Sequence, residues 1–131
     1  PIYVSDSNPQ PLFDYIVDHL NALKLTYIHV IEGATGGPRD NAPFDYASLR
    51  KRFKQAYIAN NGYDFALAEK VLEAGAADLI AFGKPFISNP DLVERLKAGA
   101  PLNEWDKATF YGGGAKGYTD YPTLKATEAA E

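Results

Sequence analysis

Three apolar stretches of strand length alternate with helical patterns along the chain, and this alternation limits the fold more than any other feature. Strands are predicted at residues 26–31, 56–59 and 79–82, each after a segment whose apolar residues recur at three- and four-residue spacing. A further helix is predicted after the third strand, with Asp91 or Asn89 as its cap. Strands that alternate with helices favour an α/β fold in which right-handed crossovers join parallel strands.

Three strands make an incomplete sheet. In a chain of 131 residues, an open parallel sheet of three strands leaves two edges and much apolar surface uncovered. The pattern therefore favours a piece of a parallel barrel over a complete domain. The alternation stops after Gly99, where an aromatic and glycine-rich extension begins. We expect residues 1–124 to form the barrel portion with this extension, and residues 125–131 to form a polar tail.

Charge and composition exclude several classes of function. The formal net charge of −4 gives no electrostatic basis for binding a nucleic-acid backbone, and no apolar run reaches the roughly 20 residues that span a bilayer. Cysteine is absent, and His19 and His29 are too few and too far apart to predict a metal site. We expect a cytoplasmic protein, with His29 packed in the core and His19 on the surface of its helix.

Two of the predicted strands run directly into turns that suit an anion. The first turn contains Asn60, Asn61 and Gly62, which tolerate positive φ and can leave backbone amides free. The second contains Phe82, Gly83 and Lys84, where a missing side chain permits close approach and a cation follows. In parallel barrels, the loops after the last two strands commonly build a shared phosphate site. Each turn taken alone is better explained as a simple connection, and only the two together favour an anion site.

Four motifs in order closely resemble the carboxyl-terminal third of the old yellow enzyme family, the FMN-dependent ene-reductases also called NADH:flavin oxidoreductases. They are YIHVIE at 27–32, IANNGYD at 58–64, AFGKPFISNPDL at 81–92, and FYGGGAKGYTDYP at 110–122. The resemblance covers nearly the whole chain. It implies that this chain supplies strands six, seven and eight of a TIM-type (βα)8 barrel, followed by the irregular extension.

The same resemblance implies a cofactor and a reaction. FMN is reduced by NAD(P)H and then passes hydride to an activated alkene such as an enone or nitroalkene. The phosphate of FMN is expected at Asn60, Asn61, Gly62, Phe82, Gly83 and Lys84, and the substrate pocket at Phe110 and Tyr111. The family usually has arginine where Lys84 stands, so a point charge replaces a bidentate fork. The family's proton donor belongs to earlier strands, so no catalytic residue is expected in this chain.

Three hypotheses follow. The chain is the C-terminal part of such a reductase, whose partner is the rest of the barrel. Alternatively, it is a partial barrel that associates with itself and binds phosphate or flavin without catalysis. A duplicate that binds no ligand is the third. A small-molecule partner is expected in the first two, and neither a nucleic acid nor a membrane in any of them.

Overall fold

The structure, a computed structural model, describes residues 6–34, 37–39 and 44–125. The chain divides into two compact units, Pro1–Ala81 and Phe82–Glu131, and each is described by itself. Residues 126–131 of the predicted polar tail lie outside the described residues. None of the described helices combines the length and the apolar character that crossing a membrane requires.

The first unit contains a parallel sheet of three strands, in the order β1-β2-β3, as predicted. The strands are β1 (Tyr27–Ile31), β2 (Ala56–Asn60) and β3 (Leu79–Ala81). Ile31 pairs with Asn60, and Asn60 pairs with Ala81. The three strands therefore end level with one another at one edge of the sheet.

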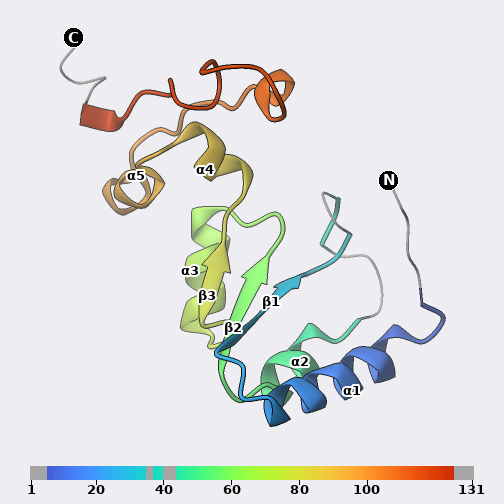
Figure 1. The fold of residues 1–131 in the computed structure, drawn as a ribbon. Helices are drawn as coiled ribbons and strands as arrows, with labels where there is room; N and C mark the ends of the chain where they lie inside the picture. The colour runs from blue at the N-terminus through green and yellow to red at the C-terminus, as the bar shows by residue number, and fades with distance from the viewer. Residues whose placement is uncertain (1–5, 35–36, 40–43, 126–131) are drawn as a thin grey trace. The chain divides into compact units, whose positions relative to one another are not determined.

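Helices precede or connect these strands: α1 (Pro9–Ala22), α2 (Tyr46–Arg52) and α3 (Phe65–Glu73) (Figure 1). Two of them begin at aspartate caps. The Asp45 carboxylate accepts from the Ser48 amide at 3.1 Å, and the Asp64 carboxylate accepts from the Leu67 amide at 2.8 Å. Each cap satisfies an amide that has no partner within its helix, which explains why both helices start where they do.

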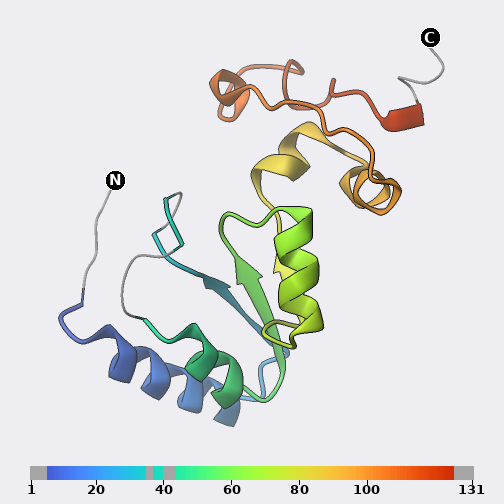
Figure 2. The same cartoon turned by 180° about the vertical axis from the view of Figure 1, so that it is seen from behind.

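The core of this unit lies on one face of the sheet. Tyr57 and Ala59 of β2 have no exposed surface, and Leu49 and Phe53 beside α2 are almost fully buried. Figure 2 shows α3 lying across the same side of the sheet. One sheet face is thus covered by helices, as in the outer layer of a barrel.

The opposite face is open in this chain. Tyr27, Ile31 and Leu79 remain 55%, 44% and 52% exposed. The prediction that His29 packs in the core is wrong for this chain: His29 alternates with the buried Ile28 on β1 and lies with the exposed residues. Successive residues of a strand point to opposite faces, and no described segment of this unit covers this one. His19 is exposed on α1, as predicted.

The second unit contains α4 (Lys84–Ser88), α5 (Leu92–Ala98) and a short 3₁₀ helix, η1 (Lys107–Thr109). The sequence predicted only α5; α4 is an additional turn of helix that begins immediately after Gly83. Asp91 occupies the N-cap position of α5, but its side chain does not cap the helix. It pairs instead with Arg95. Beyond Gly99, which ends α5 in the left-handed region at φ 62°, the described chain is largely irregular.

Candidate functional site

The turn after β2 has the backbone conformation that its sequence predicts. Asn61 and Gly62 have φ values of 99° and 65°, in the region that favours glycine and tolerates asparagine. No hydrogen bond among the described residues uses the Gly62 amide. This amide is therefore available to an anion.

The Asn61 amide is already used, contrary to the expectation that the turn leaves its amides free. It donates to the side-chain oxygen of Asn60 at 2.6 Å. The Asn61 side chain reaches in the other direction, and its Nδ2 donates to the carbonyl oxygens of Glu32 at 2.7 Å, Ala34 at 3.0 Å and Gly37 at 3.3 Å. Asn61 thus joins the turn after β2 to the segment after β1, and an anion would need Asn60 to rotate before it could accept from the Asn61 amide.

A cluster of side chains around Glu32 adjoins the same turn, since the Glu32 carbonyl oxygen accepts from Asn61 Nδ2. The Glu32 carboxylate is buried and accepts from Arg39 Nη2 at 2.6 Å, Tyr63 OH at 2.7 Å and Tyr57 OH at 3.3 Å. The Arg39 guanidinium also stacks 4.0 Å from the centre of the Tyr63 ring. Burial first and the Glu32 carboxylate second raise the pKa of Tyr63 to about 12, and the pKa of Tyr57 is raised for the same reasons. Both phenols are therefore neutral donors that compensate the buried charge.

Sequence reasoning did not assign a role to this cluster. Glu32 and Tyr63 both fell within motifs, but a glutamate at the end of a strand and a tyrosine after a turn carry no sign that they meet. The paired strand ends bring them together. Gly33 adds to the same segment, since its amide donates to Tyr46 OH at 2.6 Å.

The turn after β3 presents open backbone. Among the described residues, the amides of Gly83 and Lys84 have no hydrogen-bond partner, and a Cβ added to Gly83 would meet nothing within 4 Å. The φ of Gly83 is −96°, so no left-handed conformation demands glycine here. The space above its backbone fits the prediction that glycine admits a close ligand. Lys84 is exposed, and its Nζ lies 5.2 Å from the centre of the Trp105 ring.

Phe110 and Tyr111 follow η1 in the second unit. Phe110 is half-buried beside Trp105, with the ring centres 5.6 Å apart. Tyr111 is 93% exposed and meets Phe110 edge-on at 6.4 Å. An exposed tyrosine of this size is available for contact with another surface or a ligand.

The predicted site residues therefore fall into two groups, each described within its own unit. Asn60, Asn61 and Gly62 form the turn of the first unit. Phe82, Gly83 and Lys84 begin the second, which also carries Phe110 and Tyr111. Across the described residues, no three acidic or histidine side chains gather as metal ligands.

The chain belongs to the NADH:flavin oxidoreductase / NADH oxidase family, which it matches over residues 8–103. It is 40% identical over 121 residues to a 12-oxophytodienoate reductase-like protein of Solanum lycopersicum, covering 92% of this chain and 33% of that protein. It is 39% identical over 120 residues to a probable flavin mononucleotide-dependent alkene reductase of Leishmania infantum, with shares of 92% and 32%. The structure of morphinone reductase superposes with a TM-score of 0.85 at 42% identity, covering 94% of this chain and 33% of that one.

These matches establish the family predicted from the motifs. They also show that structural relatives of this small parallel sheet belong to larger barrels. The structural relatives are old yellow enzyme TIM barrels. This chain spans about a third of the length of the relatives that it matches. In a closed TIM barrel, side chains from all the strands fill the sheet face opposite the helices; in this chain that face carries the exposed Tyr27, Ile31 and Leu79.

Proposed function

We propose that this chain is the C-terminal part of an FMN-dependent NAD(P)H oxidoreductase that reduces activated alkenes, and that its two turns hold the FMN phosphate. The single observation that carries the proposal is the pairing of Asn60 with Ala81, since it starts both turns from adjacent, level strand ends. The available amides of Gly62, Gly83 and Lys84 and the lysine charge fit a phosphate group.

FMN, when bound, supplies a hydride from its reduced ring to the β-carbon of an alkene that a carbonyl or nitro group activates. The residues of this chain have a supporting part. Gly62, Gly83 and Lys84 hold the phosphate by amides and charge, and Phe110 with Tyr111 contributes apolar and phenolic surface to the substrate pocket. The reductant is NAD(P)H, and the substrate class is an enone, a nitroalkene or a similar small molecule.

The phosphate role of Lys84 is tested by comparing FMN with riboflavin, which has the same ring and no phosphate. The protein used in this test is a complete barrel. It is expressed from a longer reading frame, or it is made by joining this chain to the first two-thirds of morphinone reductase. A pair of unit charges in contact is worth about 1 kcal/mol in water. Lys84→Glu replaces one attraction of this size by one repulsion of this size. The change of about 2 kcal/mol should weaken FMN binding roughly 30-fold.

Riboflavin binding should be unchanged in Lys84→Glu. Lys84→Arg should retain or improve FMN affinity, because the guanidinium fork suits a phosphate. Lys97→Glu is the matched control: it makes the same change of charge at an exposed position of α5. Equal losses for FMN and riboflavin in Lys84→Glu contradict a phosphate role, and no loss for either contradicts any role in binding the flavin.

A second function is favoured by one specific observation, the exposed apolar sheet face. A partial barrel with Tyr27, Ile31 and Leu79 uncovered can associate with a second copy and bind phosphate or flavin without catalysis. Sedimentation of this chain during an FMN titration separates the two functions. Saturable binding by a dimer supports the second one, whereas activity restored only by the rest of the barrel supports the first. If flavin binds neither to this chain by itself nor to the complete barrel, the third hypothesis, a duplicate that binds no ligand, is supported.

A further inference from the structure

Arg95 is the most deeply buried charged side chain among the described residues of the second unit, with 3% of its surface exposed. It lies on α5 and pairs with Asp91 one turn earlier, with 2.8 Å between Nε and the carboxylate. A buried guanidinium is stable only when its donors are satisfied. The partners of its remaining N–H donors therefore show which segments of the chain Arg95 holds together.

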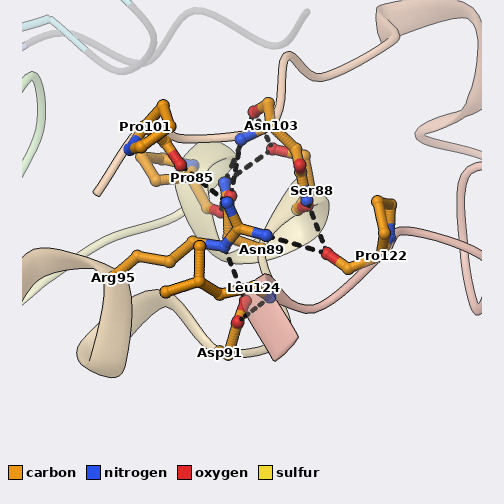
Figure 3. A network of polar contacts seen from close by, with 9 residues as sticks. All are labelled: Pro85, Ser88, Asn89, Asp91, Arg95, Pro101, Asn103, Pro122 and Leu124. Atoms are coloured by element: carbon orange, nitrogen blue, oxygen red, sulfur yellow. Dashed lines mark hydrogen bonds and ion pairs between the residues drawn. The ribbon is translucent and has the colours of Figure 1, made fainter. Parts of the chain in front are cut away.

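These donors reach both ends of the extension that follows α5. Arg95 Nη1 donates to the carbonyl oxygen of Pro101 at 2.6 Å, and Nη2 donates to that of Pro122 at 3.0 Å. Figure 3 shows the guanidinium between these two carbonyl groups. One planar side chain thus joins the beginning and the end of residues 101–122 and closes them into a loop, which we call the aromatic loop.

Neighbouring side chains reinforce the same closure. Asn103 Nδ2 donates to the Pro122 carbonyl oxygen at 2.8 Å and to that of Ser88 at 2.8 Å, while the Asn103 amide donates to Asn89 Oδ1 at 2.7 Å. Ser88 and Asn89 have no exposed surface. The closure is therefore anchored to α4 as well as to α5.

Asp91 extends the closure one step further. Its second carboxylate oxygen accepts from the Leu124 amide at 2.6 Å, just beyond the loop. This hydrogen bond and, after it, the interaction with Arg95 hold the pKa of Asp91 below its usual value, against the opposing effect of burial. Asp91 stays ionised at neutral pH and keeps Arg95 in place.

Within the aromatic loop, the Asp106 amide donates to Tyr121 OH at 3.0 Å and the Gly117 amide donates to Asp120 at 2.6 Å, but little apolar surface is buried. Gly117 is the only described residue of 102–121 that is buried, and Gly112 and Gly113 both have positive φ, at 80° and 84°. The Phe110 ring contacts those of Trp105 and Tyr111, but Trp105 and Tyr111 are exposed. With so few buried apolar contacts, the position of these rings depends on hydrogen bonds, and those at the ends of the loop are the ones that tie it to α4 and α5.

We propose that Arg95 is a positioning residue for substrate binding: by joining the carbonyl groups of Pro101 and Pro122, it sets where Phe110 and Tyr111 stand. This inference rests on the proposed function, in which those two rings contact the substrate. Arginine is needed because its fork serves Asp91 and both carbonyl groups at once. A lysine ammonium in the same place cannot span them with its single nitrogen.

The test is Arg95→Lys in the complete barrel, with three measurements. Hydrogen exchange of residues 102–121 should quicken about tenfold, as expected for the loss of one charge-assisted hydrogen bond, while exchange in β2 stays unchanged. The KM for cyclohexenone should rise at least about fivefold, and FMN affinity should not change. Asn103→Ala, which keeps Arg95 and loses one donor to Pro122, should give a smaller change of the same kind. Arg52→Lys is the control, because Arg52 makes exposed ion pairs in the first unit.

Several results overturn the inference. Unchanged exchange in the loop shows that Arg95 does not hold it closed. A parallel loss of FMN affinity and protection in β2 shows a general structural role. Phe110→Ala and Tyr111→Ala separate this inference from the proposed function. If the two alanine variants raise KM and Arg95→Lys does not, only the positioning role of Arg95 fails. If none of the three variants raises KM, the substrate role of both rings fails as well.

Discussion

Replacing Asn61 with alanine should loosen the segment after β1, although Asn61 belongs to the turn after β2. The substitution removes the amide that donates to Glu32, Ala34 and Gly37. The two shorter hydrogen bonds, at 2.7 Å and 3.0 Å, are worth about 1 kcal/mol each in net terms. Alanine at a φ of 99° costs about 1 kcal/mol more, because only asparagine and glycine tolerate that region. The expected loss is about 3 kcal/mol.

Asn61→Gly separates the two contributions, since glycine loses the same hydrogen bonds but relieves the backbone. Its net loss should be about 2 kcal/mol, the value of the two hydrogen bonds alone. The assay is urea unfolding of the complete barrel, combined with hydrogen exchange at residues 32–39. Exchange there should quicken by up to roughly 100-fold in Asn61→Ala. Asn8→Ala is the matched control, because Asn8 caps α1 without a side-chain hydrogen bond.

The reasoning is refuted if Asn61→Ala unfolds within about 0.5 kcal/mol of the unsubstituted protein. It is also refuted if the glycine and alanine variants lose the same amount, because the backbone conformation then contributes nothing. A loss of FMN affinity that exceeds the loss of stability would add a direct contact with the cofactor to the structural role.

Two further predictions concern the same region. Gly33→Ala should destabilise by more than about 2 kcal/mol in thermal unfolding, because a Cβ there clashes with the Pro38 carbonyl oxygen at a φ of 81°; Gly75→Ala, at φ 66° with nothing within 4 Å, should cost only about 1 kcal/mol. The raised pKa of Tyr63 means that its contribution to stability is complete below pH 10 and is lost as the pH rises from about 10 to about 12. Urea unfolding across that range should show this decline, and Tyr63→Phe should reduce it; a decline of equal size in Tyr63→Phe would show that ionisation of Tyr63 is not its cause.

Local patterns predicted most of the elements correctly. The three strands, the three helices before and between them, and α5 all rest on short-range apolar spacing, which acts within a few residues and needs no distant partner. The additional helix α4 was missed because a single turn after a glycine has too few residues to show a period. His29 was misplaced because strand spacing tells which residues share a face, but not whether that face is covered.

The cluster around Glu32 and the pairing of Asp91 with Arg95 could not be predicted from the sequence. Glu32, Arg39 and Tyr63 are separated by a loop, a helix and a strand, and they meet only because β1 and β2 end level with each other. Asp91 or Asn89 was predicted to cap a helix, which is what an aspartate or asparagine in such a position usually does. In the folded unit, the buried guanidinium of Arg95 competes for the same carboxylate and prevails, because an unpaired buried charge is more costly than an exposed helix end.

The sequence by itself determined the α/β class, the family and the two turns that follow the strands, because these depend on residue types at fixed spacing. Only the tertiary structure decided which amides in those turns are available, what supports Asn61, and how the aromatic loop is closed. Those features arise from hydrogen bonds between residues far apart in the chain, such as the bond from Arg95 to Pro122. Their partners become neighbours only after the strands have paired and the helices have packed.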